Sequence, residues 1–213
     1  MPWLAAVLCF ATVVWAAKEY VAPPLQNASV FPARDEHPQE RVVVAADPYD
    51  TREKERIFTL PYSEKGLLPV YLVISNNGDQ PVSLMDMNVE LVTTGRDKIA
   101  PADEDDLYRR FSKVSTRPGQ PSRVPIPLPR RAPRGSISAE GLDEIKRAPF
   151  QARAVEPGAT QAGFVFLDVT DIREPLAGAR LYVSGLRNGE GKELMFFEIA
   201  MDKYLAAPRT TSR

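Results

Sequence analysis

The sequence predicts a mainly β protein, an antiparallel β-sandwich with one or two short helices and a long insertion rich in proline and arginine. The first observation is the stretch Leu68–Val92, in which an apolar strand, a polar turn at Asn76–Asp79 and two further strand signals follow one another. The second is Phe164–Leu167, where aromatic and aliphatic side chains alternate. The third is the count of 20 prolines, which favours strands and turns over helices.

The strand that opens this stretch is apolar on both of its faces. One face carries Val70, Leu72 and Ile74 at period two, and the other carries Tyr71 and Val73. A strand of this kind is expected to be covered on both sides. It therefore predicts the centre of the sandwich.

The first sixteen residues have the pattern of a signal peptide. They contain no charged side chain, and the apolar run Trp3–Trp15 is shorter than the roughly 20 residues that cross a bilayer. We expect cleavage after Ala16 and export to the periplasm or the exterior. Cleavage would also remove Cys9, the only cysteine. An amphipathic or buried N-terminal helix and a lipoprotein modified at Cys9 are the alternatives.

The composition is that of an ordinary soluble globular protein, with 44% hydrophobic residues, 26% charged residues and a formal net charge of −1. The absence of a net positive charge argues against nucleic acid as a partner. We expect a Pro-rich tether over residues 17–40, one sandwich domain over 41–205, and a disordered tail over 206–213. His37, the only histidine, is interpreted as a solvated residue of the tether.

Local patterns place the remaining elements. We expect a hairpin-like turn at Thr94–Arg96 and a polar turn at Arg187–Gly191, and we expect Tyr204 and Leu205 to hold the end of the chain. Strands are expected over residues 41–46, 57–60, 98–101, 150–155, 161–169, 179–184 and 193–199. Helices are expected over 102–111 and 138–147.

The first predicted helix begins with four acidic residues. The acids Asp103–Asp106 precede Arg109 and Arg110, which complements the helix dipole at both ends. Leu107 and Phe111 lie four residues apart and form a short apolar stripe, which predicts that the helix is held at the rim of a sheet. A calcium site is the alternative for the four acids. Their spacing differs from that of an EF-hand loop, and we expect no metal and no cofactor.

A long insertion over residues 112–137 separates the two helices. It carries six basic residues and no acid, and Val124–Pro129 alternates proline with aliphatic residues in the manner of an extended polyproline rod. One interpretation is an arm that binds another envelope protein. The other is a flexible insertion between two strands. The candidate binding residues are Arg117, Arg123, Arg130, Arg131 and Arg134.

Three motifs occur in a fixed order: the strand ending in Asn76–Val82, the turn Glu156–Gly158, and the strand Gly163–Phe166. This pattern resembles bacterial exported immunoglobulin-like domains of unknown function, in which Asn-x-x-Asp-x-Pro-hydrophobic precedes a Pro-Gly turn and a Gly-x-x-Phe strand. The resemblance covers roughly Val42–Ile199, interrupted by the insertion. It implies an immunoglobulin-like sandwich in the cell envelope and carries no catalytic residues across.

The sequence offers little for catalysis. Without Cys9 the mature chain has no thiol, and its single histidine makes a histidine-dependent nucleophilic triad poorly supported. We therefore expect a non-enzymatic exported binding or structural module. One alternative is an accessory subunit of a larger exported or membrane-associated complex, anchored through the Pro/Arg arm. A second is a carboxylate-dependent hydrolase, which would require two of the 28 acidic residues to converge in space.

Overall fold

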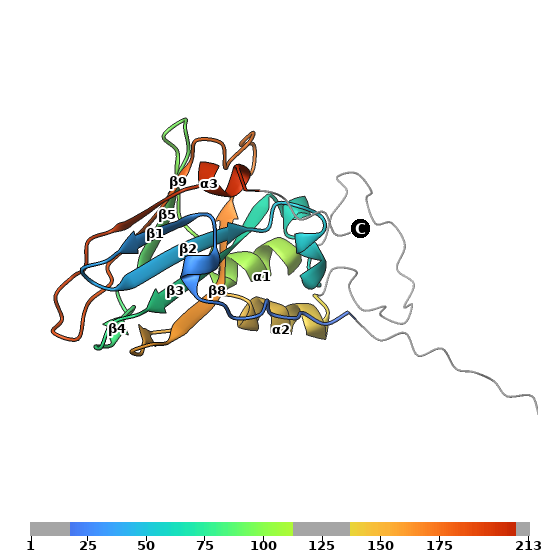
Figure 1. The fold of residues 1–213 in the computed structure, drawn as a ribbon. Helices are drawn as coiled ribbons and strands as arrows, with labels where there is room; N and C mark the ends of the chain where they lie inside the picture. The colour runs from blue at the N-terminus through green and yellow to red at the C-terminus, as the bar shows by residue number, and fades with distance from the viewer. Residues whose placement is uncertain (1–17, 113–136, 208–213) are drawn as a thin grey trace, which may run out of the picture.

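Two four-stranded antiparallel sheets face each other in the computed structural model, which describes residues 18–112 and 137–207 (Figure 1). The strands are β1 (Arg34–His37), β2 (Val42–Pro48), β3 (Leu67–Asn76), β4 (Val82–Ser83), β5 (Asn88–Val92), β6 (Lys98–Ile99), β7 (Ala154–Val155), β8 (Thr160–Asp168), β9 (Arg180–Ser184) and β10 (Phe197–Ala200). The helices are α1 (Glu104–Ser112), α2 (Ala139–Arg147) and α3 (Asp202–Leu205), with short 3-10 turns η1 (Ala28–Val30), η2 (Lys54–Ile57) and η3 (Ser63–Lys65).

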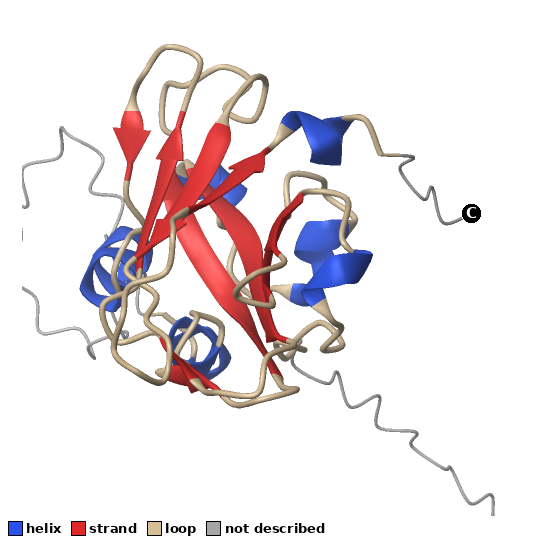
Figure 2. Cartoon of the chain, turned by 60° about the vertical axis from the view of Figure 1, so that its left-hand side comes forward, coloured by secondary structure: helices blue, strands red, loops and turns tan. Residues whose placement is uncertain are grey.

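The strand order defines the two layers. The first sheet has the order β1-β2-β3-β8 and the second sheet the order β10-β9-β5-β6, while β4 and β7 form a separate two-stranded ribbon. Helices α1 and α2 lie outside the strands, against the first sheet (Figures 1 and 2). The prediction of a mainly β, antiparallel sandwich is confirmed.

The first sheet separates two apolar cores. Val70, Leu72 and Ile74 face the second sheet in the inner core, whereas Tyr71 and Val73 belong to an outer core beneath the helices and the N-terminal segment. All five side chains are buried. The predicted coverage of β3 on both faces is therefore confirmed.

Strand β8 has the same two-sided character. Val165 and Leu167 belong to the inner core, and Phe164 and Phe166 belong to the outer core. The two aromatic rings pack against Phe58, with ring centroids 4.9 Å and 6.3 Å from it. The alternation predicted from the sequence is thus confirmed, and it assigns the aromatic face of β8 to the helix side.

The predicted tether over residues 17–40 is wrong for the described residues of that range. Arg34–His37 forms β1, which pairs with β2 in the register Arg34 opposite Ala45. Ala28 is buried and its N–H donates to Ser75 Oγ at 2.8 Å. The Tyr20 ring stacks on Phe58, with a centroid distance of 5.8 Å. The prolines of this segment interrupt regular elements, but they leave its side chains free to pack on the first sheet.

His37 also differs from its predicted role as a solvated loop residue. Its ring stacks on Phe197 of β10 with a centroid distance of 4.0 Å. Its two ring nitrogens lie 3.4 Å from Asp35 Oδ2 and 2.9 Å from Glu40 Oε2. The ring therefore connects the edges of the two sheets, because β1 and β10 belong to different layers.

Two predicted strands are replaced by other structure. Residues 57–60 end η2 and cross the outer face of the first sheet, where the N–H groups of Thr59 and Leu60 donate to the Glu144 carboxylate at 2.5 Å and 3.3 Å. Of residues 150–155, Ala154–Val155 alone forms a strand, β7. Phe150 instead donates its N–H to the Phe164 carbonyl at 2.9 Å. Neighbouring segments thus satisfy main-chain groups that we expected in ladders.

Both predicted helices form, and each begins at a polar residue. Asp103 Oδ1 accepts the Asp106 N–H at 2.7 Å at the start of α1, and Ser138 Oγ accepts the Gly141 N–H at 3.1 Å at the start of α2. Leu107 of α1 is buried in the outer core. Helix α1 is therefore held against the first sheet beside β8, its edge strand, where Arg110 pairs with Asp168.

The end of the domain is held as predicted. Tyr204 lies in α3 and is buried in the inner core. Its hydroxyl donates to Asp50 Oδ1 at 2.5 Å, and Lys54 Nζ lies 4.6 Å from the centre of its ring. Helix α3 is thereby joined to the connection that follows β2.

Glu144 is a buried carboxyl between α2 and the segment that follows η2, and it makes stability depend on pH. Burial raises the pKa of Glu144, although the Thr59 and Leu60 N–H donors oppose this. A carboxyl whose pKa is higher in the folded chain stabilises the fold below its unfolded pKa, and this contribution is lost as pH rises through the folded pKa. We expect the free energy of unfolding to decline as pH rises from the unfolded pKa of Glu144 to its higher folded pKa. The substitution Glu144→Gln should remove this decline.

Urea unfolding at a series of pH values from about 4 to 8 measures this effect. Glu140→Gln, on the same helix, is the matched control and should keep the wild-type decline. A decline that persists unchanged in Glu144→Gln would contradict the assignment. At lower pH a second effect has the opposite sign: a hydrogen bond from Arg110 lowers the pKa of Asp168 to about 2, so its contribution is lost as pH falls toward that value.

Candidate functional site

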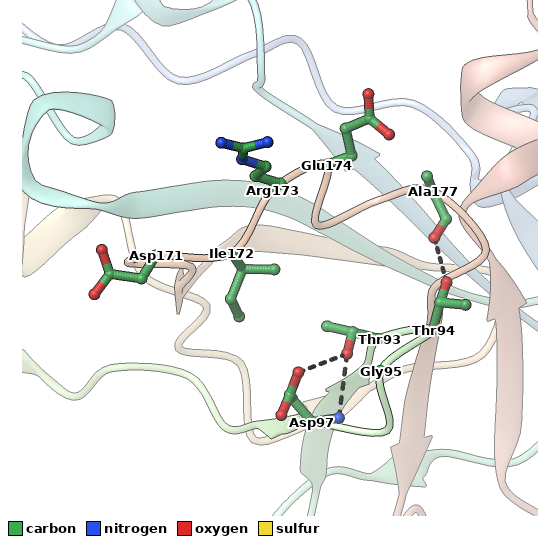
Figure 3. Close-up of a pocket in the computed structure, with 9 residues that line it drawn as sticks. All are labelled: Thr93, Thr94, Gly95, Asp97, Asp171, Ile172, Arg173, Glu174 and Ala177. Carbon is green, nitrogen blue, oxygen red and sulfur yellow. Dashed lines mark hydrogen bonds between the residues drawn. The ribbon is translucent and has the colours of Figure 1, made fainter.

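Two loops lie side by side at one end of the sandwich. Strands β5 and β9 are antiparallel neighbours with Val92 opposite Arg180, so the turn that leaves β5 adjoins the loop that enters β9. The Thr94 hydroxyl donates to the Ala177 carbonyl at 2.6 Å and ties the two loops together. A cavity of about 410 Å³ opens between them (Figure 3). We refer to residues 93–97 and 170–178 as the paired loops.

The floor of this cavity is formed by side chains that are already hydrogen-bonded or apolar. The Thr93 hydroxyl accepts the Asp97 N–H at 3.1 Å and donates to Asp97 Oδ2 at 3.2 Å. Ile172 points from the opposite loop toward Thr93 and Asp97 (Figure 3). These contacts fix the turn after β5 and give the cavity one apolar wall.

The rim carries charged side chains. Asp171, Arg173 and Glu174 follow one another closely along the loop before β9, are exposed, and point away from Ile172 (Figure 3). Within residues 18–112 and 137–207, none of the three forms an ion pair. Their charges are therefore available to a ligand that lies over the cavity.

The backbone of the paired loops adopts an unfavourable conformation at three positions. Arg96, Asp171 and Glu174 have φ angles of 67°, 64° and 50°, in the left-handed region. For arginine and glutamate this conformation costs roughly 1–2 kcal/mol per residue, whereas aspartate adopts it more readily. Arg41 is the fourth such non-glycine residue in the described chain. Three of these four residues thus belong to the loops around one cavity.

Neighbouring contacts hold the loop before β9 in this conformation. The Ala177 N–H donates to the Glu174 carbonyl at 3.0 Å, and the Gly178 N–H donates to Asp202 Oδ1 at 2.9 Å. The loop is therefore fixed at its β9 end by α3 and by its own turn. Such strain is concentrated at functional sites, where the surrounding structure holds it in place.

The chemistry of this cavity suits binding by ion pairs and hydrogen bonds. Its lining contains three carboxylates, from Asp97, Asp171 and Glu174, and one guanidinium, from Arg173. No group of three potential metal-ligating side chains occurs in the part of the chain that the structure describes. A polar ligand with a positively charged group therefore matches the charges at the rim.

The site residues predicted from the sequence belong to the insertion and not to this cavity. Arg117, Arg123, Arg130, Arg131 and Arg134 all lie outside the described residues, as do the predicted signal peptide and most of the tail. The acidic run Asp103–Asp106 is described, and it forms the start of α1, where Asp106 pairs with Arg109.

Comparisons with known proteins add little to this geometry. No family model matches the sequence, and no curated protein matches it. Among solved structures, the chain is similar to the 2.2 Å crystal structure of a conserved hypothetical protein from Bacillus anthracis, with 13% sequence identity, coverage of 78% of this chain and 91% of that chain, and a TM-score of 0.32. A likeness at this level carries no conclusion about function.

No helix in the described ranges is long and apolar enough to cross a membrane.

The paired loops were missed by sequence reasoning, which identified only the turn Thr94–Arg96. The available signal was local: polar residues such as Asp97 and Arg173 lie between strand patterns. Polar loops connect most strands, so this signal does not single out a site. The two loops become one site because β5 pairs with β9.

Proposed function

We propose that this protein is an exported, non-enzymatic binding module of the cell envelope, an immunoglobulin-like sandwich that contacts a partner protein through its paired loops. The observation that carries this proposal is the concentration of left-handed, strained residues in these loops, at Arg96, Asp171 and Glu174. Strain of this kind is retained where a fixed loop shape is useful. In folds of this class the loops cluster at the two ends of the sandwich, and loops held on such a scaffold commonly carry binding residues.

The strand order supports the immunoglobulin-like assignment. In that fold, strands A, B and E share one sheet, and strands C, F and G share the other. Here β2, β3 and β8 match A, B and E, while β5, β9 and β10 match C, F and G. The chain then crosses between the sheets at the same points as in the Greek-key connections of that fold.

Two further observations support export and binding. The uncharged apolar run Trp3–Trp15 has the length of a signal peptide. The exposed charges of Asp171, Arg173 and Glu174 form a polar rim of the kind that surrounds protein interfaces. An exported module with such a rim is suited to a charged partner surface.

Neutralisation of the rim tests this proposal. We expect Asp171→Asn, Arg173→Gln and Glu174→Gln together to weaken partner binding by about tenfold or more, because they remove the charges and keep polar side chains at the same positions. The partner would be isolated from the solubilised envelope of the source organism with the immobilised wild-type protein. Its affinity for each purified variant would then be measured by titration.

A matched control exists on the opposite layer of the molecule. Glu140→Gln, Asp143→Asn and Arg147→Gln on α2 make the same three kinds of replacement away from the paired loops. This control should bind the partner as the wild type does. Equal affinity of the loop variant and the wild type would overturn the proposal, as would the absence of any saturable partner.

A further inference from the structure

One edge of β5 is only partly paired, and it borders a groove on the side of the sandwich. Strand β6 pairs with Leu91 and Val92 of β5. In the same register, the residue opposite Val89 is Pro101, which has no N–H and instead bridges to Leu167 of β8. The ladder between β5 and β6 therefore ends before Val89.

The main chain of Val89 faces this open edge. The Thr93 N–H donates to the Asp97 carbonyl at 3.0 Å on the β6 side. In an antiparallel strand every second residue points its N–H and C=O the same way, so Leu91 and Val89 also face this side. Strand β9 pairs with β5 from the other side, and among the residues that the structure describes no main-chain bond from outside the sheet ladders reaches the Val89 N–H or C=O. The strand thus presents one donor and one acceptor in line with its existing ladder.

The opposite wall of the groove is the outer edge of β8, and it also presents a donor. Phe166 lies opposite Pro69 of β3, at a position whose main chain points outward. Its carbonyl accepts the Ala102 N–H at 2.7 Å, and two residues earlier the Phe164 carbonyl accepts the Phe150 N–H at 2.9 Å. Between these two contacts, the Phe166 N–H points away from β3, and no acceptor outside the sheet ladders is found for it within the described ranges.

An unpaired main-chain N–H on a buried residue is rare in folded proteins. Phe166 is buried, so its amide needs a water molecule or a ligand carbonyl. The cavity that it borders has a volume of about 250 Å³ and is lined from both edges, by Met87, Asn88 and Val89 on one side and by Phe164, Val165 and Phe166 on the other. Phe150 and Pro101 add to its apolar lining.

We propose that this groove, which we call the β5–β8 groove, binds an extended peptide segment of a partner protein by strand addition. The segment would pair with the main chain of Val89 next to β6. One of its carbonyl groups would accept a hydrogen bond from the Phe166 N–H, and one of its apolar side chains would enter the cavity. Main-chain groups left unpaired at a strand edge provide affinity for such a segment, and the pocket provides side-chain selectivity. This inference is independent of the paired loops, which lie at the end of the sandwich.

The test uses the 15N-labelled full chain and a defined probe. The probe is a capped peptide of about eight residues in which valine and leucine alternate with threonine, a length typical of a strand. We expect the amide signals of Val89 and Phe166 to shift saturably with a Kd below about 1 mM, and their hydrogen exchange to slow by about tenfold or more. The same peptide with alternate N-methyl groups should not bind, because it keeps the side chains and loses its donors.

A variant pair tests the pocket itself. Ala102→Leu fills the cavity and should weaken peptide binding by about tenfold, whereas Ala139→Leu, on the surface of α2, should leave it unchanged. Unaffected Val89 and Phe166 signals would overturn the proposal, as would equal binding of the N-methylated peptide. Protection of Val89 that rises with protein concentration, together with a dimer in sedimentation analysis, would assign the groove to a second copy and would also overturn it.

Discussion

Replacing Phe166 with alanine is expected to lower the free energy of unfolding by about 3–5 kcal/mol, the usual range for emptying an aromatic core site. Phe166 is 1% exposed. Its ring stacks on Tyr62 with a centroid distance of 4.4 Å and lies near Phe58 in the outer core. The lost packing would therefore lie between the first sheet and the connection that carries Phe58 and Tyr62, rather than between the two sheets.

Urea unfolding followed by circular dichroism measures this change. Phe196→Ala is the matched control, because this neighbour of β10 is 45% exposed and its removal should cost less than about 1 kcal/mol. A loss below about 1 kcal/mol for Phe166→Ala would mean that the outer core tolerates a cavity, and it would contradict the assigned packing.

Replacing Gly185 with alanine is expected to cost about 2–5 kcal/mol, from two separate causes. Gly185 has a φ of 79°, which side chains other than glycine adopt at a cost. An added Cβ would also lie 2.0 Å from the carbonyl oxygen of Asp86, a main-chain atom that can move away only if its loop shifts. The glycine thus permits the close approach of the loop before β5 to the end of β9.

Gly191 separates the two causes. It has the same φ of 79°, and nothing lies within 4 Å of the Cβ that alanine would add. Gly191→Ala should therefore cost only about 1–2 kcal/mol, the conformational part. The difference between the two variants in urea unfolding measures the steric part. Equal losses would show that the loop at Asp86 moves freely, and would contradict this account.

The central strands could be predicted from the sequence because their patterns are local. Val70 and Tyr71 begin an alternation that only a strand with two covered faces explains, and Phe164 and Val165 repeat it. Ser138 likewise marks the start of α2 through its capping oxygen. In each case the chain's immediate neighbours fix the conformation.

Other elements depend on distant partners and have no local pattern. Strand β1, Arg34–His37, contains three charged residues and a histidine, so its sequence alone indicates a loop. It is a strand because it pairs with β2. Residues 57–60 are the opposite case, because their pattern predicts a strand that does not form. Their N–H groups donate instead to the carboxylate of Glu144, which is distant in the sequence. Tertiary contacts override local preference in both cases.

The candidate site also depends on tertiary contacts that have no local sequence pattern. Asp97 and Arg173 are ordinary loop residues in the sequence, and only the pairing of β5 with β9 brings them to one cavity. The strained φ angles of Asp171 and Glu174 also have no sequence signature, because neither residue type is typical of that conformation to the extent that glycine is.

The pairing of β3 with β8 also sets the order in which this chain can fold. Leu67 pairs with Asp168 and Ser75 with Thr160, so the largest strand contact joins the two halves of the sequence. A chain emerges from synthesis with its N-terminal part first. Until residues 160–168 follow, β3 can pair with β2 but lacks its second neighbour, β8, and the two phenylalanines of β8 that complete its outer face. Folding dominated by such distant contacts is slow, on the order of milliseconds to seconds, and during that interval the most apolar strand of the protein is the one most exposed to aggregation.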